Sequence, residues 1–326
     1  MILPSCKSGS NKEGADSSKK KKVVVKLYPK EDKASGKYGY EDLHEKMVIK
    51  TQFDYAGYFY EGLARVGKGE FEYSMPKSAV KYGFINAEGK MVIDYKYDEA
   101  DDFKNGYAKV GTGSRDEYGL FEGNYGYINA EGKEVIAPAY KHARDFYDGL
   151  AAVGNGSYFK GEYKFIDETG KTVIAGPYDA ADDFLGGMAA VQNGDRYGFI
   201  DKTGKTILPF EFQNYMVVTG LISNDYQGYT DDKGRIIVKK NGKWGMIDKS
   251  NKTIIDFNWD ELGVFKSGLA KAKVGEKWGY IDETGKLVIP AKYDRATGMS
   301  HGDAIVYIGD KSMTIDTKGN CIKNCN

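Results

Sequence analysis

The stretch KWGYIDETGKLVIPAKYDRATGMSHGDAIV, residues 277–306, is one copy of a pattern that fills almost the whole chain from Lys37 onward. Two short apolar runs within it, Tyr280–Asp282 and Leu287–Ile289, are joined by the sequence ETGK. This connection has hairpin length, and its glycine stands where the backbone needs a positive φ. The two runs are therefore predicted to form a β-hairpin.

The second half of the same stretch predicts a third strand. Pro290 removes a ladder donor, so we expect the second strand to end there and residues 291–300 to cross irregularly. The run Asp303–Tyr307 then restores the strand pattern. Each copy is thus predicted to be a three-stranded antiparallel meander. Such a small sheet is not stable alone, so neighbouring copies must stack.

The copies can be counted on one isoleucine of the first hairpin strand. The spacings between successive copies are 43, 38, 34, 47, 34 and 34 residues, which gives a base period of 34. An earlier divergent copy begins at Lys37, and the final copy, Ser312–Ile322, stops after its hairpin. The seven isoleucines are Ile85, Ile128, Ile166, Ile200, Ile247, Ile281 and Ile315.

The turn residues repeat in the same way. Each hairpin turn carries a glycine except one, where Asn251 stands, and asparagine is the other residue that tolerates the left-handed region. Third strands alternate small and apolar residues, as in Ala64-Arg65-Val66 and Ala108-Lys109-Val110. We expect the alanine and valine side chains to share one face and to pack closely against the next copy.

These motifs make the chain similar to the WG-repeat (KWG) family of bacterial β-repeat proteins. Lys243–Asp248 and Lys277–Asp282 match its signature, and the resemblance covers roughly residues 37–322. In other copies tyrosine replaces the tryptophan, and Lys164 stands where the glycine should be. The resemblance implies a repeat scaffold, often secreted or surface-associated, without a shared catalytic site. It therefore argues against an enzyme, and no cofactor is expected.

Composition agrees with one all-β array rather than two ordinary domains. The 42 glycines and 13% aromatic residues fit many tight turns between short strands. Lys+Arg and Asp+Glu are both 47, which disfavours nucleic acid as a partner. No apolar run approaches the ~20 residues that span a bilayer. We divide the chain into a tether (1–22), the array (23–322, about eight units) and a tail (323–326).

The tether, MILPSCKSGSNKEGADSSKKKK, has no periodicity and is rich in Ser, Gly and Lys, as flexible segments are. Leu3-Pro4-Ser5-Cys6 resembles the end of a bacterial lipoprotein signal, with Cys6 as the lipidated residue. Pro4 is unusual there, and the apolar segment of a secretory signal is missing. The hypothesis is a lipid-anchored envelope protein, at the outer membrane or cell surface. The alternative is a cytoplasmic protein with a basic tail.

Two further cysteines, Cys321 and Cys325, lie close together near the C-terminus. They could form a disulfide in an oxidising compartment, or remain as free thiols in a frayed tail. Zinc is disfavoured, because the three histidines fall in different copies and no four-ligand set is visible. We therefore predict no metal site.

The two ends of the array look complementary. Val23–Tyr28 stands where a third strand should precede the first hairpin, while the last hairpin, Ser312–Ile322, lacks one. If joined, they would complete an eighth unit and close a β-propeller-like ring, which removes exposed edges. If not joined, they are the two ends of an open superhelical solenoid. The sequence leaves both arrangements open.

Insertions lengthen three consecutive copies at the same place, between a third strand and the next hairpin. These segments, 67–79, 111–124 and 154–162, are predicted as loops that lie side by side on one edge. Aromatic anchors among charged residues suit a protein interface or a sugar-stacking surface. The alternative is that these rings fold back over their own loops. The candidate binding edge consists of Phe71, Tyr73, Tyr118, Phe121, Tyr158 and Phe159.

Signals for catalysis are few. The acidic pairs Asp101-Asp102 and Asp182-Asp183 recur at one repeat position, as solvated turn residues would. No complete calcium loop, phosphate-binding loop or nucleophile with a nearby histidine is visible. The sequence thus favours a non-catalytic scaffold that binds a protein partner on the cell envelope. The alternative is a repeat protein that binds a glycan or cell-wall polymer, with membrane contact only through the N-terminal lipid.

Overall fold

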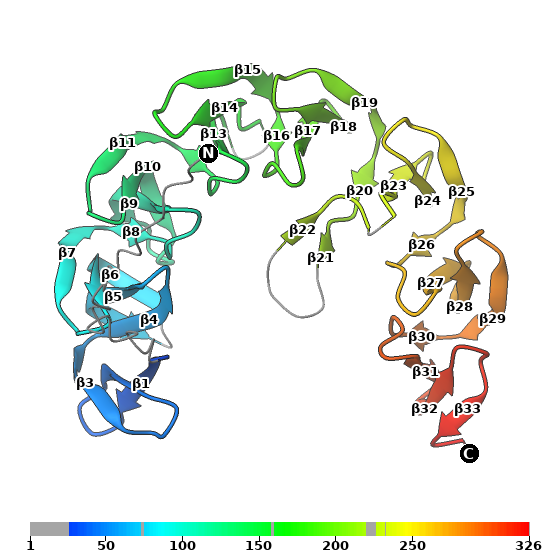
Figure 1. Cartoon of the computed structure of the whole chain (residues 1–326), viewed down its shortest axis with the longest axis horizontal. Coiled ribbons are helices and arrows are strands. Elements are labelled where there is room, and N and C mark those ends of the chain that lie inside the picture. Colours follow the sequence, from blue (N-terminus) through cyan, green and yellow to red (C-terminus); the bar gives the residue numbers. More distant parts are fainter. Residues whose placement is uncertain (1–25, 73–74, 158–159, 220–225, 232, 326) are drawn as a thin grey trace, which may run out of the picture.

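The computed structural model describes residues 26–72, 75–157, 160–219, 226–231 and 233–325, which form an open arc of small β-sheets (Figure 1). Seven sheets have four strands and the first has three, and all pairings are antiparallel. The all-β repeat array predicted from the sequence is confirmed. Within these described ranges, no helix is long and apolar enough to cross a membrane.

The strands follow one another along the arc. The first sheet contains β1 (Tyr28–Asp32), β2 (Lys37–Glu41) and β3 (Met47–Phe53). The second contains β4 (Tyr55–Tyr60), β5 (Leu63–Glu72), β6 (Met75–Asn86) and β7 (Met91–Tyr97). The third contains β8 (Glu99–Ala100), β9 (Tyr107–Arg115), β10 (Phe121–Asn129) and β11 (Glu134–Tyr140). The fourth contains β12 (His142–Ala143), β13 (Leu150–Gly154), β14 (Tyr163–Asp167) and β15 (Thr172–Tyr178).

The second half of the arc repeats this order. The fifth sheet contains β16 (Ala180–Ala181), β17 (Met188–Asn193), β18 (Arg196–Asp201) and β19 (Thr206–Phe212). The sixth contains β20 (Asn214–Tyr215), β23 (Ile236–Lys240), β24 (Lys243–Ile247) and β25 (Thr253–Trp259), with β21 (Val218–Thr219) and β22 (Tyr226–Gly228) paired separately. The seventh contains β26 (Glu261–Leu262), β27 (Leu269–Val274), β28 (Lys277–Asp282) and β29 (Leu287–Tyr293). The eighth contains β30 (Arg295–Ala296), β31 (Asp303–Ile308), β32 (Lys311–Asp316) and β33 (Cys321–Lys323).

The strands are grouped differently from the predicted three-stranded meander. The predicted third strand, β31, pairs with β32 of the following copy, not with its own hairpin. Only Gly309 and Asp310 separate β31 from β32, and such a short connection gives a hairpin. The crossing segment after β29 instead leads to the next sheet and supplies its two-residue first strand, β30. Each of the seven four-stranded sheets therefore spans two sequence copies.

The predicted end of the second strand at Pro290 is wrong. β29 runs through Pro290 to Tyr293, and the equivalent strands β11, β15 and β19 also contain a proline. Each is the last strand of its sheet and lies on the convex side of the arc (Figure 1). A proline is tolerated on such an edge strand because no further strand needs its missing N–H.

The predicted hairpin turns are confirmed in atomic detail. Gly285 has φ +83° and Asn251 has φ +65°, both in the left-handed region. Asp282 closes its turn through Oδ1, which accepts hydrogen bonds from the backbone N–H groups of Thr284 (2.9 Å) and Lys286 (3.1 Å). An Asp or Asn occupies this position in every repeat turn, because its side chain can replace a backbone acceptor.

The same turn glycines also connect neighbouring sheets. A Cβ on Gly285 would lie 3.2 Å from Cγ2 of Ile255 in the preceding sheet, and a Cβ on Gly319 would lie 3.2 Å from Ile289. Seven buried clusters form the core, and each joins residues of two successive sheets. Stacking between sheets therefore provides the core that no single sheet could form.

The glycine of the Trp-Gly pair has a different role. A Cβ on Gly279 would lie 2.5 Å from the carbonyl oxygen of Ile289, where the partner strand bulges. Glycine permits this close approach of the two backbones. Where Lys164 replaces the glycine, the partner strand carries Gly176 with φ +63°. The departure from the motif in one strand is thus accompanied by a glycine in the other.

The array is open. β1 pairs only with β2, and the first and last sheets lie at opposite ends of the arc (Figure 1). Of the two predicted arrangements, the open array is the one observed. β1 is already paired within the first sheet and β31 within the last, so neither strand is available to pair with the other end. Of the predicted strand Val23–Tyr28, only Tyr28 belongs to β1, and residues 23–25 lie outside the described ranges.

Candidate functional site

The predicted binding edge consists of lengthened hairpins. The first two insertions, predicted as loops, continue the β-ladder: Gly111–Arg115 pair with Phe121–Tyr125, and β5 pairs with β6 as far as Glu72 and Met75. In the third, Ser157 and Lys160 form an isolated antiparallel bridge. The first two hairpins lie side by side, since a Cβ on Gly119 would be 2.9 Å from the carbonyl oxygen of Pro76.

Two of the predicted anchor residues pack within their own sheets. Phe71 stacks on Tyr55 with ring centroids 5.4 Å apart, and its ring covers Gly67. Phe121 packs on Tyr125 at 5.1 Å and covers Gly111 in the same way. A side chain in place of either glycine would displace the ring. Both phenylalanines are half-buried and stabilise the hairpins from within.

The third described anchor residue is exposed. Tyr118 is 81% exposed at the tip of the second hairpin, and two apolar neighbours, Leu120 (65%) and Met75 (68%), are also exposed. Tyr73, Tyr158 and Phe159 lie outside the described residues. Because Gly119 contacts Pro76, the three exposed apolar side chains flank one contact between two hairpin tips.

Arg115 holds the second tip in place. Its guanidinium donates to the carbonyl oxygens of Gly119 and Asp98, each at 2.9 Å, and to Glu99 Oε2 at 2.6 Å. The Arg115 side chain is only 7% exposed, so these interactions are shielded from water. Grooves of about 380 and 650 Å³ lie on either side of this hairpin. The tip is thus a fixed projection between two grooves.

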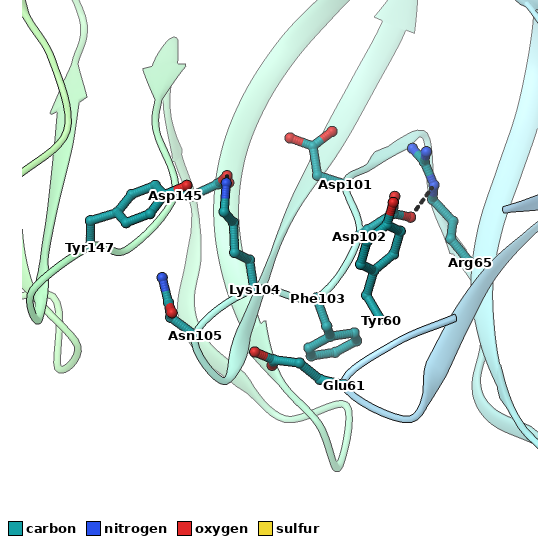
Figure 2. Close-up of a pocket in the computed structure, with 10 residues that line it drawn as sticks. All are labelled: Tyr60, Glu61, Arg65, Asp101, Asp102, Phe103, Lys104, Asn105, Asp145 and Tyr147. Carbon is teal, nitrogen blue, oxygen red and sulfur yellow. Dashed lines mark ion pairs between the residues drawn. The ribbon is translucent and has the colours of Figure 1, made fainter. Parts of the chain in front are cut away.

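The acidic pairs are engaged in ion pairs and are not the solvated turn residues that we predicted. Asp101 Oδ2 lies 2.8 Å from Lys109 Nζ. Asp102 Oδ1 lies 3.3 Å from Arg65 Nε, and Figure 2 shows this second pair. Asp182 forms an ion pair with Arg144. Both members of the first pair therefore have a basic partner on another strand.

The basic partners were missed in the sequence, although a signal was present. Arg65 and Lys109 occupy the middle of the Ala-x-Val motif, where only the alanine and valine were interpreted. Arg65 donates to the carbonyl oxygen of Ala100, and Lys109 to that of Ala143 at 3.1 Å. Each of these carbonyls belongs to the two-residue strand of the next sheet, so the basic side chains tie successive sheets together.

Burial changes the pKa of Asp183 in the second acidic pair. Desolvation raises the pKa of Asp183 to about 6, although Arg144 opposes the shift. Asp182 accepts a hydrogen bond from the hydroxyl of Tyr215. Among the described residues, no group of three or more His, Cys, Asp or Glu side chains is arranged to hold a metal ion.

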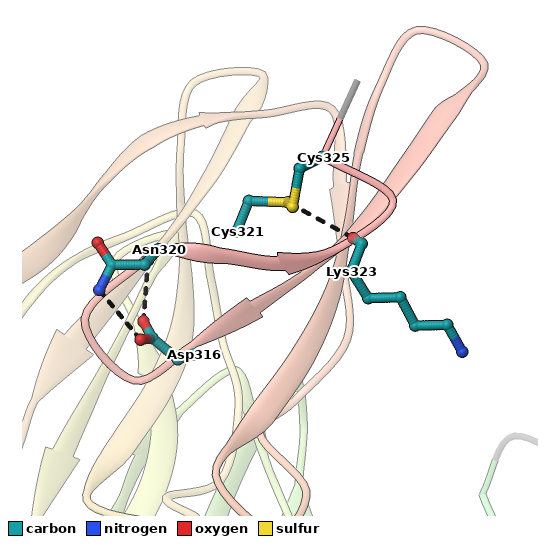
Figure 3. Close-up of a disulfide and its surroundings, with 5 residues drawn as sticks. All are labelled: Asp316, Asn320, Cys321, Lys323 and Cys325. Atoms are coloured by element: carbon teal, nitrogen blue, oxygen red, sulfur yellow. Dashed lines mark hydrogen bonds between the residues drawn. A yellow bond between two sulfur atoms is a disulfide. The ribbon is translucent and has the colours of Figure 1, made fainter.

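The C-terminal cysteines are bonded to each other in the structure. Cys321 and Cys325 form a disulfide with 5.6 Å between their Cα atoms, beside the last strand (Figure 3). The preceding turn is closed by Asp316, which accepts hydrogen bonds from the backbone N–H (2.8 Å) and side-chain amide (3.0 Å) of Asn320. Cys6, the predicted lipidation site, lies outside the described residues.

Comparison with family models identifies the repeat. The model described as "WG containing repeat" matches residues 38–70, 82–114, 125–158, 165–197, 197–219, 244–278 and 278–311. The chain belongs to the WG-repeat family. The resemblance inferred from the Lys-Trp-Gly motifs is therefore confirmed. No curated protein matches the chain significantly in sequence.

Several solved structures are similar to this chain at low identity and low TM-score. Apo AztD from Citrobacter koseri is 12% identical, with 92% of each chain covered and a TM-score of 0.38. The Listeria monocytogenes EGD-e protein lmo1340 is 16% identical over 81% of this chain and 90% of its own, with a TM-score of 0.36. Kluyveromyces lactis Hsv2 is 11% identical over 84% and 88%, with a TM-score of 0.36. These scores are too low to carry an argument about function.

Proposed function

We propose that this WG-repeat chain is a non-catalytic scaffold that binds a protein partner through the tips of its lengthened hairpins. The observation that carries the proposal is the exposed apolar group Met75, Tyr118 and Leu120 around the contact between two tips. Apolar anchors on a fixed support, with charged residues around them, are the usual centre of a protein interface. The curved array provides the rigid support.

The placement of the aromatic rings favours a protein over a glycan. A sugar-binding edge needs several aromatic faces open to solvent, but Phe71 and Phe121 are engaged within their own sheets. Tyr118 is the one described anchor ring that is exposed, and its neighbours Met75 and Leu120 are aliphatic. Such a mixed group suits an apolar protein surface better than the polar face of a sugar.

A photo-cross-linking amino acid at position 118 tests this proposal. In extracts of the native host, we expect one stoichiometric protein adduct from position 118 and none from a matched probe at Leu43. Leu43 is 68% exposed in a turn of the first sheet, far from the hairpin tips. The adduct should disappear when Met75 and Leu120 are both changed to serine. Equal labelling from the two positions, or labelling of glycans alone, would contradict the proposal.

We also propose that Cys6 is lipidated and anchors the array to the bacterial envelope. The Leu-Pro-Ser-Cys motif and the disulfide support this placement, since disulfides persist in oxidising compartments. The test is the mass of the N-terminal peptide of protein isolated from the host membrane fraction. Acyl chains on Cys6 are expected. An unmodified N-terminus in the soluble fraction would favour the cytoplasmic alternative.

A further inference from the structure

A second candidate site lies at the opposite end of the strands from the hairpin tips. A pocket of about 680 Å³ opens where three successive sheets meet (Figure 2). The β4–β5 turn contributes Tyr60 and Glu61, the segment after β8 contributes Asp101 and its neighbours, and the segment after β12 contributes Asp145 and Tyr147. The pocket is thus a product of the stacking.

The pocket has an excess of negative charge. Its lining contains four carboxylates, Glu61, Asp101, Asp102 and Asp145, and two basic groups, Arg65 and Lys104, for a net charge of −2. Lys109 contacts Asp101 from outside the lining, and the net charge is −1 when Lys109 is counted. A partly enclosed acidic surface concentrates cations and strengthens their binding.

The carboxylates are held in fixed positions. Glu61 Oε2 accepts a hydrogen bond of 2.9 Å from the backbone N–H of Gly106, and Asp145 lies 3.5 Å from Lys104 Nζ. Because each carboxylate is held through one oxygen, the other can still accept a hydrogen bond. The site is therefore preorganised for a donor that enters from solvent.

The pocket also has aromatic walls. Tyr60 is 47% exposed on one side, and the ring of Tyr147 lies on the other side of the pocket (Figure 2). The protein already places one cation on such a wall, since Lys104 Nζ lies 4.5 Å from the ring centroid of Tyr147. Tyr60 offers a second face of the same kind, and a cation next to such a face is attracted by its π-electrons.

From these observations we infer that the pocket binds a lysine or arginine side chain of a protein partner. The carboxylates of Glu61 and Asp101 receive the cationic group, and Tyr60 covers its aliphatic stem. Both basic side chains are long enough to reach into a pocket while their backbone stays outside. Because β5 runs from this pocket to the hairpin tip, the two proposed surfaces lie at opposite ends of one strand.

The experiment uses a fluorescent glycine peptide that carries one lysine, with arginine, glutamine and acetyl-lysine versions. We expect the lysine and arginine peptides to bind the full chain, and binding to weaken by about ten-fold or more when the charge is removed. Asp101→Asn and Tyr60→Ala should weaken binding, while a variant with Met75 and Leu120 changed to serine should bind normally. Because this variant damages only the hairpin tips, it distinguishes failure of the pocket inference from failure of the proposed hairpin interface.

Four results would overturn the inference. Equal binding of the acetyl-lysine peptide would show that charge is not recognised, and normal binding by Asp101→Asn would place the site elsewhere. Preference for glucosamine over the lysine peptide would assign the pocket to an amino sugar. Binding seen only after Lys19–Lys22 are changed to glutamine would identify the chain's own basic segment as the occupant. Circular dichroism of each variant confirms that it is folded.

Discussion

The inner sheets and the two terminal sheets share one backbone but present different faces. In the inner sheets, the face toward the preceding sheet is apolar, as at Val66 and Ile85, both fully buried. In the first sheet the same positions, defined by strand pairing, hold Lys30 and Glu41, whose side chains form an ion pair of 3.1 Å. A stacking surface has thus been replaced by a hydrated one.

The last sheet shows the same replacement on its opposite face. Tyr280 and Ile289 of the seventh sheet are buried against the eighth. The corresponding positions of the eighth sheet are Thr314 and Lys323, which pair with each other in β32 and β33. Polar outer faces are what terminal repeats need for solubility. The comparison explains the open arc, because neither terminal face offers the apolar surface that stacking requires.

The largest expected difference in stability is between alanine substitutions at equivalent positions of an inner sheet and the last sheet. Phe165 is fully buried and packs against Phe184, with ring centroids 4.8 Å apart. Phe165→Ala should lower the free energy of unfolding by about 3–5 kcal/mol. Thr314→Ala, at the equivalent position of the last sheet, should change it by less than about 0.5 kcal/mol. Urea unfolding followed by circular dichroism measures both, and similar losses would contradict the assigned faces.

A smaller difference is expected between two turn glycines. Gly285 and Gly36 both have positive φ, +83° and +67°, so alanine at either should cost about 1–2 kcal/mol. Only Gly285 also packs on a neighbouring sheet, since Gly36 has open space around it. Gly285→Ala should therefore destabilise more than Gly36→Ala in the same urea experiment. The reverse order would show that turn conformation alone limits these positions.

The hairpins could be predicted from the sequence because their signals are local. The Thr-Gly-Lys turns and the flanking apolar runs lie within a few residues of each other, and Asn251 obeys the same rule as the glycines. The grouping into sheets was misread, although Asn241-Gly242 between β23 and β24 is a strong turn signal for the connection that was overlooked. Once these two-residue turns are given priority, the four-stranded sheets follow.

The side-chain contacts between sheets could not be read in this way. Arg65 reaches a carbonyl 35 residues later, and nothing near Arg65 in the sequence marks that partner. The inward folding of Phe71 depends on Gly67, which comes to lie beneath its ring only once the two strands pair. The candidate site was thus predicted in position but only partly in side-chain orientation, because orientation depends on tertiary neighbours.

The inner and terminal sheets should also differ in their response to pH. The pKa of Asp183 is raised to about 6 by burial, whereas the pKa of Asp316 in the last sheet is lowered by hydrogen bonds from Asn320. Because folding raises the pKa of this carboxyl, its protonated form stabilises the fold. The stabilisation is fully present below the unfolded pKa near 3.8 and is lost as pH rises through 6. Stability should therefore increase from pH 7 to pH 5.

Two variants assign this response to its residue. Asp183→Asn removes the titrating group and should reduce the gain in unfolding midpoint between pH 7 and pH 5. Asp316→Asn should leave the gain unchanged, because the contribution of Asp316 is present above its unfolded pKa and is lost only as pH falls below that range. A pH response that survives Asp183→Asn would assign the effect to another group.

The most direct test of the terminal faces is to make the first sheet resemble an inner one. This change should have a small effect on stability. Lys30→Val with Glu41→Ile restores the residue types found at Val66 and Ile85. The lost ion pair is exposed, so unfolding should change by less than about 1 kcal/mol. The new apolar face should instead cause concentration-dependent self-association, because an exposed apolar patch favours contact with a second copy. Light scattering during size-exclusion chromatography would detect it, with Lys30→Gln and Glu41→Gln together as the polar control. A double variant that stayed monomeric at high concentration would show that charge at these positions is not what ends the stack.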